Sequence, residues 1–186
     1  IDGTRARLSL DHAEGDLQFT NTILDYRTYR SLGTRYSLAL RMLGASSAGD
    51  DPQIFRVGGP YTVRSTDYGE IEGSHLAFAN LEFRFPFIDR LNTAFPLPFS
   101  WPSIRGAIFF DAGGAWGYAF DEGVKRDFQP FTSDGGFRLN DMTAAFGAGL
   151  RMGLGFLIGR YDVAQPTNLD ENLGHARHFF SLGADF

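Results

Sequence analysis

The chain has 186 residues, a formal charge of −5, no cysteine, and a single lysine beside 16 arginines. Its hydrophobic fraction of 43% is too high for a disordered protein, and the lack of cysteine excludes a disulfide scaffold and any cysteine-based zinc or redox site. The mild acidity argues against a nucleic-acid-binding protein. The chain contains no run of ~18 apolar residues, so no transmembrane helix is predicted. The sequence starts at Ile1 without an initiator methionine or a leader, so we expect a processed product or a piece of a longer chain.

Apolar and polar residues alternate with a period of two along the chain, and this pattern predicts eight β-strands. In chain order they span Thr4–His12, Phe19–Ser31, Arg35–Leu43, His75–Phe87, Ile104–Trp116, Met142–Gly153, Phe156–Gln165 and Arg177–Phe186. Tight turns at Ser31–Thr34 and Leu154–Gly155 contrast with long loops at 45–73 and 117–141, and the Pro-rich stretch Asp89–Ser103 is expected to be an ordered turn. Residues 1–186 are therefore expected to form one meandering antiparallel domain.

Each predicted strand has an apolar face and a charged face. In His75–Phe87, for example, Leu81 and Phe83 point to one side, whereas Glu82 and Arg84 point to the other. A soluble barrel or sandwich would turn the apolar face inward, and a membrane barrel would turn it outward against lipid. The alternation alone does not separate the two architectures.

Three features favour the membrane barrel. Arginine and carboxylates on the strands, with almost no lysine, suit an enclosed lumen of paired charges better than a wet surface. Short turns that alternate with long loops are typical of outer-membrane barrels. Aromatic residues mark the ends of the apolar faces, as an interfacial girdle would: Tyr36, Phe83, Phe85, Trp116, Tyr161 and Phe186. We therefore predict an all-β fold, an antiparallel transmembrane β-barrel.

The chain ends on an alternating strand with an aromatic last residue. Phe180, Leu182 and Phe186 share one face of the segment Arg177–Phe186. This ending resembles the C-terminal signal by which bacterial outer-membrane proteins are recognised for assembly, and an open strand edge of this kind can pair with another strand. The resemblance implies an outer-membrane location in a diderm, Gram-negative bacterium.

Four motifs follow one another along the chain in a familiar order. They are F-R-V-G-G-P-Y-T-V-R-S-T-D-Y-G-E from Phe55 to Glu70, A-N-L-E-F-R-F-P-F from Ala79 to Phe87, F-F-D-A-G from Phe109 to Gly113, and G-R-Y-D-V-A-Q-P from Gly159 to Pro166. Over nearly the whole chain this arrangement resembles the C-terminal barrel region of the outer-membrane assembly and translocation family, the BamA- and TamA-like bacterial surface antigen proteins.

The resemblance implies a specific role for the long loop 45–73. In that family the loop folds back into the lumen, and an arginine at its tip pairs with acidic residues on the wall. Carried over to this chain, Arg64 is that arginine and Glu82 and Asp111 are its partners; we call these three residues the loop lock. The face pattern agrees, because both carboxylates lie on polar strand faces, and a guanidinium can bridge two carboxylates where an ammonium would not do so as well.

The loop motif itself comprises Gly58, Gly59, Val63 and Ser65 around the lock arginine. Ser65 stands where the family usually has glycine. Because serine adopts a positive φ less readily than glycine, we expect an altered loop tip or a weaker lock at this position.

Glycines on the predicted inner faces bear on the same loop. Gly113, Gly147 and Gly149 are expected to leave room for it to approach the wall.

Size limits how these strands close. A barrel of eight strands is filled by its own side chains, so a loop of nearly thirty residues does not fit inside it. We therefore expect half of a larger barrel, of about 16 strands, completed by N-terminal strands, by a second copy or by another membrane subunit.

The functional expectation is a barrel without enzymatic activity, cofactor or metal, which inserts or translocates polypeptides at the outer membrane, with outer-membrane lipid and outer-membrane protein clients as partners. Two alternatives stay open: a structural anchor or assembly subunit without transport, and, less favoured, an outer-membrane hydrolase. The histidines His12, His75, His175 and His178 show no catalytic or metal-ligand spacing, and the acidic turns near Asp50 and Asp170 do not match a calcium loop.

Overall fold

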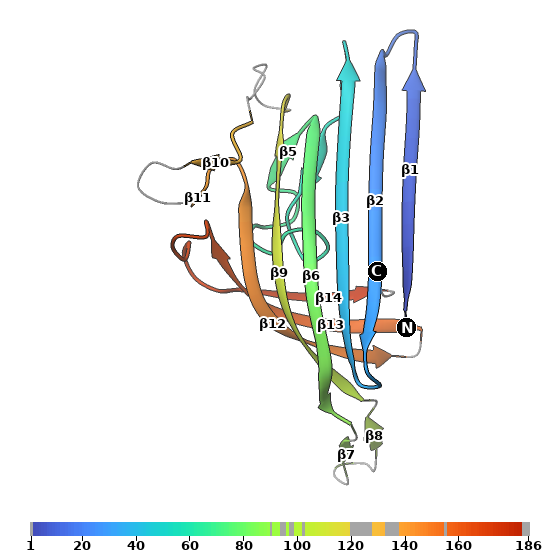
Figure 1. Cartoon of the computed structure of the whole chain (residues 1–186), viewed down its shortest axis with the longest axis vertical. Coiled ribbons are helices and arrows are strands. Elements are labelled where there is room, and N and C mark those ends of the chain that lie inside the picture. The colour runs from blue at the N-terminus through green and yellow to red at the C-terminus, as the bar shows by residue number, and fades with distance from the viewer. Residues whose placement is uncertain are drawn as a thin grey trace.

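The computed structural model describes residues 2–89, 91–93, 96, 99–101, 103–119, 128–132, 138–154 and 156–183. Eight long strands form one antiparallel sheet in the order β1-β2-β3-β6-β9-β12-β13-β14 (Figure 1). Their bounds are β1 Gly3–Ala13, β2 Phe19–Leu32, β3 Tyr36–Gly49, β6 His75–Ile88, β9 Ile104–Trp116, β12 Thr143–Leu154, β13 Leu157–Thr167 and β14 Arg177–Gly183. Short hairpins pair β4 Phe55–Val57 with β5 Ile71–Gly73, β7 Leu91–Thr93 with β8 Phe99–Trp101, and β10 Phe131–Thr132 with β11 Arg138–Leu139.

The eight predicted strands and their all-β antiparallel meander are confirmed, with three differences in detail. The strand expected to end at Leu43 continues to Gly49, because its small residues pair with β2, Ala45 opposite Ile23. The long loop therefore begins after Gly49 rather than at residue 45, and it contains the β4–β5 hairpin. The stretch expected to be an ordered turn, Asp89–Ser103, carries the β7–β8 hairpin. Residues 184–186 of the last predicted strand lie outside the described residues.

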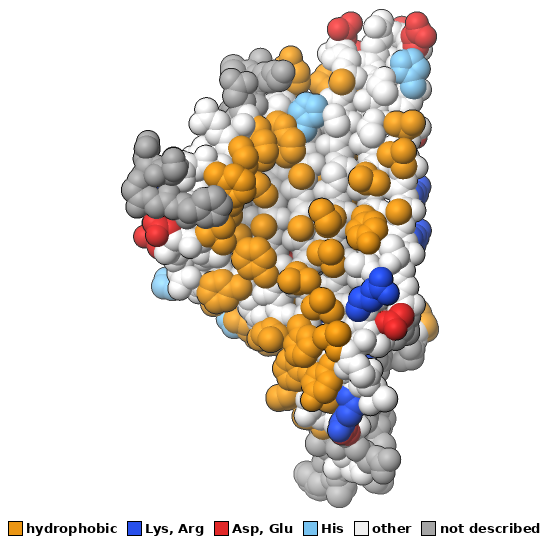
Figure 2. All heavy atoms as spheres, in the orientation of Figure 1, with side chains coloured by type: hydrophobic (Ala, Val, Ile, Leu, Met, Phe, Trp, Pro, Cys, Tyr) orange, Lys and Arg blue, Asp and Glu red, His pale blue; other side chains and the backbone are white. Residues whose placement is uncertain are grey.

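The sheet has its apolar side chains outside and its charged side chains inside. Leu81, Ile108 and Phe110 are exposed, whereas Glu82 and Asp111, their neighbours along the same strands, are almost fully buried. Figure 2 shows hydrophobic side chains gathered over β3, β6, β9 and β12 on the face toward the viewer. This is the reverse of a soluble sandwich and the arrangement expected of a wall that faces lipid.

The sheet curls without closing. β12, β13 and β14 cross the lower half of Figure 1 at a steep angle to the upright β1, β2 and β3. The two end strands, β1 and β14, do not pair with each other in the described part of the chain. Among the described residues there is no helix long and apolar enough to cross a bilayer.

Aromatic side chains cluster near opposite ends of the β6–β9 ladder. At one end Tyr36 stacks on Phe83, with ring centroids 5.9 Å apart. At the other end Trp116 lies opposite His75 in the ladder and stacks on Phe128 at 4.0 Å. Of the residues expected to form a girdle, Tyr36, Phe83 and Trp116 belong to these two clusters, Tyr161 lies in β13 beside His178, and Phe186 lies outside the described residues.

Candidate functional site

The loop between β3 and β6 is folded back on itself around two glycines. Gly58 and Gly59 have φ values of 128° and 89°, a region that side chains with a Cβ rarely adopt. The Gly59 N–H donates to the Thr66 carbonyl at 3.1 Å, and a Cβ at Gly58 would collide with the Asp67 carbonyl oxygen. Glycine is therefore required at both positions for the two arms of the loop to pack together.

Apolar side chains seat the loop against the concave face of the sheet. Val57 and Val63 are fully buried and pack in one cluster with Leu76 and Phe78 of β6. Complete burial of a valine side chain contributes about 1.5–3 kcal/mol. These apolar contacts therefore stabilise the position of the loop independently of its ion pairs.

Arg64, next to Val63, reaches the wall with its whole guanidinium. Its Nε and NH2 donate to the two carboxylate oxygens of Asp111 at 2.6 and 2.9 Å, a bidentate pair. Its NH1 donates to Asp162 at 3.0 Å and lies 3.6 Å from Glu82. The guanidinium carbon lies 3.3 Å from the centroid of the Phe109 ring. The structure thus brings Arg64, Glu82 and Asp111 together.

Further charged residues complete what we call the ionic cluster. Arg151 of β12 donates to Glu82 at 2.6 Å and to Asp162 at 2.5 Å, and Arg84 donates to Glu82 at 2.7 Å. The cluster therefore holds three arginines, Arg64, Arg84 and Arg151, and three carboxylates, Glu82, Asp111 and Asp162. Its charges balance, which is the condition under which buried ions are tolerated.

Burial and the neighbouring carboxylates shift the pKa of Arg64 in opposite directions. Burial alone would lower the pKa of its guanidinium, but hydrogen bonding to Asp111 and the charges of Asp111, Asp162 and Glu82 hold that pKa above its usual value. The loop thus presents a permanent positive charge to the wall.

Three of the six residues in the ionic cluster, Arg84, Arg151 and Asp162, were not predicted from the sequence to join it. Asp162 lies within the quoted motif Gly159–Pro166. Strand alternation places it on the same face as Arg160, and Arg160 is the residue opposite Arg151 in the β12–β13 ladder. Alternation likewise places Arg151 on the polar face of its strand, but it gives that residue no partner. Cross-strand register, which depends on turn geometry, was the information needed to join them.

The inner glycines make room for other groups than expected. A Cβ at Gly149 would overlap the Asp162 carboxylate, and one at Gly147 would lie 2.6 Å from the Phe109 ring. A Cβ at Gly113 would strike Phe78. These glycines therefore admit the wall side chains that meet the loop, and the expectation that they receive the loop itself was wrong.

Ser65 does not strain the loop tip. Among described non-glycine residues only Leu169 has a positive φ, so Ser65 occupies an ordinary backbone region, and Arg64 reaches its partners beside it. The expectation of an altered tip rested on a positive φ that this residue does not have.

The loop also contacts β14, the last strand of the sheet. The Tyr61 hydroxyl donates to the Leu182 carbonyl at 2.8 Å, and Arg177 lies 2.8 Å from Asp67. On the other face of β14, Phe180 and Leu182 are exposed, with 70% and 49% of their surface accessible. These are two of the three residues expected to form the terminal assembly signal; Phe186 lies outside the described residues.

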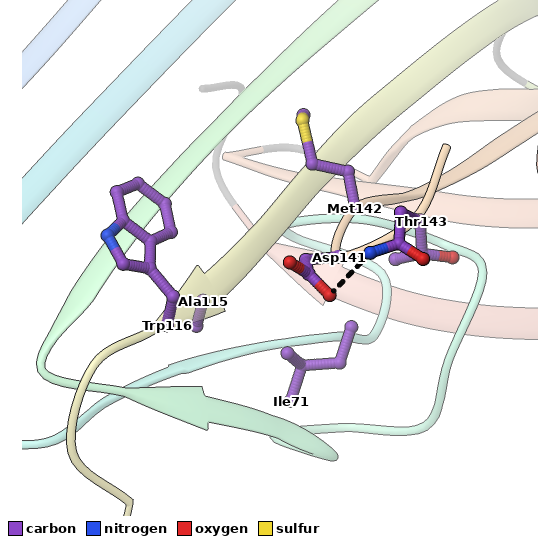
Figure 3. A pocket seen from close by; sticks show the side chains of 7 residues that line it. Ile71, Ala115, Trp116, Asp141, Met142 and Thr143 are labelled. Atoms are coloured by element: carbon purple, nitrogen blue, oxygen red, sulfur yellow. Dashed lines mark hydrogen bonds between the residues drawn. The ribbon is translucent and has the colours of Figure 1, made fainter. Parts of the chain in front are cut away.

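A hollow lies near the end of β9, away from the ionic cluster. It has a volume of about 210 Å³ and is lined by Ile71, Trp116, Asp141 and their neighbours (Figure 3). Asp141 accepts hydrogen bonds from its neighbour Asn140 at 3.1 Å and from the Gln129 N–H at 2.5 Å, so its carboxylate serves the local loop. Within the described ranges no group of His, Asp or Glu is placed to hold a metal ion.

Comparison with known proteins gives one finding about the whole chain. The family model described as the Omp85 superfamily domain matches residues 2–186. A search of curated proteins returns no match.

Proposed function

The chain belongs to the Omp85 superfamily, a family of outer-membrane protein assembly and translocation, and from this premise we propose that it is a barrel domain that inserts or translocates polypeptides at the outer membrane of a Gram-negative bacterium. We propose that it acts without enzymatic chemistry, with outer-membrane lipid and outer-membrane protein clients as its partners. The observation that carries the proposal is the loop seated inside the sheet by Arg64 and the ionic cluster.

The outward face supports a membrane-spanning wall. A transmembrane strand needs about 9–11 tilted residues, and seven of the eight long strands have 11 to 14. Exposed Leu8, Leu24, Met42 and Phe146 extend the apolar face across the sheet. In water this surface would be an aggregation hazard, whereas in a bilayer it is solvated.

The open edges support completion by further strands. Unpaired backbone groups at β1 and β14 would have no hydrogen-bonding partner in lipid, and each such group costs several kcal/mol. We propose that upstream strands, a second copy or another membrane subunit completes a barrel of about 16 strands. The loop lies on the concave side and contacts β3, β6, β9, β13 and β14. A barrel of only eight strands is filled by its own side chains, so it would not also hold this loop.

In this proposal the loop holds the wall in one curvature. Arg64 joins Asp111 of β9 to Asp162 of β13, and Tyr61 extends the connection to β14. Strands that share no ladder are thereby linked through one loop. A client strand that pairs at the edge of the sheet would meet an edge whose position depends on these contacts.

The test is reconstitution. The protein is placed in liposomes, an outer-membrane barrel protein unfolded in urea is added, and the folded fraction is followed by its gel mobility without heating. Faster folding than in empty liposomes, lost in Arg64→Ala and kept in the exposed-loop variant Arg56→Ala, is the expected result. A folding rate equal to that in empty liposomes would refute the assembly role and assign the chain to structural anchoring.

A further inference from the structure

An arginine-lined cavity opens on the concave side of the sheet, beside the tight turn that joins β2 to β3. Its volume is about 390 Å³, within the range of binding pockets for small ligands. Arg5, Arg27, Arg84 and Arg105 line it. Of the described residues on its wall, none is an aspartate or a glutamate.

The strand register places like charges opposite each other around this cavity. Arg5 of β1 faces Arg27 of β2, and Arg105 of β9 faces Arg151 of β12. Like charges directly opposite on neighbouring strands destabilise a sheet unless an anion neutralises them. The cavity therefore gathers positive charge that is unfavourable for strand pairing unless an anion is bound nearby.

Carboxylates of the sheet neutralise only part of this charge. Asp25 lies 2.6 Å from Arg27 and also pairs with Arg41, and Glu82 serves Arg84 and Arg151. Neither Arg5 nor Arg105 has a carboxylate partner in the part of the chain that the structure describes. Arg105 instead donates to the backbone carbonyl of Arg35 at 2.9 Å.

The position of the cavity selects among anions. It opens on the polar inner side, because Arg5 lies on the face of β1 opposite to the exposed Leu8 and Leu10. A ligand therefore reaches it through the space that the sheet surrounds, and lipid packed on the convex face does not. Tyr29, on the same face of β2 as Arg27, adds flat aromatic surface to the wall, against which an extended chain can pack.

We propose that this cavity binds a carboxylate-bearing segment of a polypeptide, with Arg5 and Arg105 as the residues that recognise it. The choice of a polypeptide rests on the function proposed above, whereas the choice of an anion rests on the cavity alone. Arginine suits this task because its planar donors match a carboxylate in a bidentate pair and its charge persists at any physiological pH.

The test is peptide binding to the protein folded in detergent micelles. The probe is a fluorescent octapeptide of alternating serine and aspartate, and its matched control carries asparagine in place of aspartate. We expect the aspartate peptide to bind at least about tenfold more tightly than the asparagine peptide, and more weakly as salt rises. Equal affinity for the two peptides would overturn the proposal without recourse to any variant.

Variants then locate the site. The double variant Arg5→Gln/Arg105→Gln is expected to weaken aspartate-peptide binding at least about tenfold. The control is Arg7→Gln, which removes the same charge from the same face of β1 but does not line the cavity, and we expect a change of less than about twofold. Unchanged binding in the double variant would overturn the assignment.

A binding measurement with inorganic phosphate distinguishes a phosphate site from a site for polypeptide carboxylates. If phosphate binds and the aspartate peptide does not, the cavity is a phosphate site and the polypeptide assignment fails. The reconstitution assay is independent of this measurement. Peptide binding without accelerated client folding would refute the assembly role and leave the site, whereas accelerated folding without peptide binding would refute the site alone.

Discussion

Removal of the Arg64 guanidinium tests how strongly the loop is held. In Arg64→Ala, Asp162 keeps Arg151 at 2.5 Å, but Asp111 keeps only two neutral donors, the Asn80 amide at 3.0 Å and the backbone N–H of residue 64 at 3.3 Å. The loss therefore falls on one buried carboxylate that retains no positive partner. Breaking a buried ion pair from one side costs about 3–5 kcal/mol, and we expect a free energy of unfolding lower by that amount.

The assay is urea unfolding in detergent micelles followed by tryptophan fluorescence, with tryptic cleavage after Arg56 as a second measure of loop release. Arg56→Ala is the control for the first readout, because its exposed pair with Glu72 at 3.4 Å contributes at most about 1 kcal/mol. The free energy of unfolding of Arg64→Lys should lie between those of Arg64→Ala and Arg56→Ala, since an ammonium keeps the charge but cannot reproduce the bidentate pair with Asp111. If Arg64→Ala lies within about 1 kcal/mol of the unmodified protein, the loop does not depend on the ionic cluster.

Three further comparisons probe the wall and the loop that it holds. Gly149→Ala should destabilise by about 1–3 kcal/mol in urea unfolding, because its Cβ would overlap the Asp162 carboxylate, whereas Gly153→Ala, with open space around it, should change stability by less than about 0.5 kcal/mol. Equal effects of the two glycine variants would contradict this account. Tyr61→Phe removes one hydrogen bond to the Leu182 carbonyl and should lower stability by about 0.5–1.5 kcal/mol, with faster amide hydrogen exchange in β14; unchanged exchange there would show that the loop does not hold that strand. Asp162→Asn should leave Arg64 bound to Asp111 and Arg151 bound to Glu82, so urea unfolding should register a smaller loss than for Asp111→Asn, and the reverse order would contradict this account.

Alternation predicted the strands well, because each long strand has an apolar face on the outer side of the sheet and a polar face on the inner side. It failed where side chains are small: Gly44–Gly49 has weak β-propensity, yet it continues β3 by pairing with β2. The three-residue strands β4 and β5 were not predicted, since a pattern of period two is not visible over so short a segment.

The candidate site was predictable only as far as family motifs and strand faces reach. They placed Arg64, Glu82 and Asp111 on facing surfaces, but the central position of Asp162 and Arg151 depends on register and on the curl of the sheet. The cavity that contains Arg5 and Arg105 has no local signal at all, because these residues are 100 positions apart and meet only in the folded sheet.

The central claim is that the apolar face of the sheet meets lipid and the loop lies on the other side. The chain has no cysteine, so single cysteines can be introduced and spin-labelled in the protein reconstituted in a bilayer. Labels at Leu81 and Ile108 should collide with oxygen dissolved in the lipid, and a label at the exposed loop residue Tyr68 should collide with a water-soluble nickel chelate. Labels at Leu81 and Ile108 that respond to the nickel chelate instead would contradict the claim.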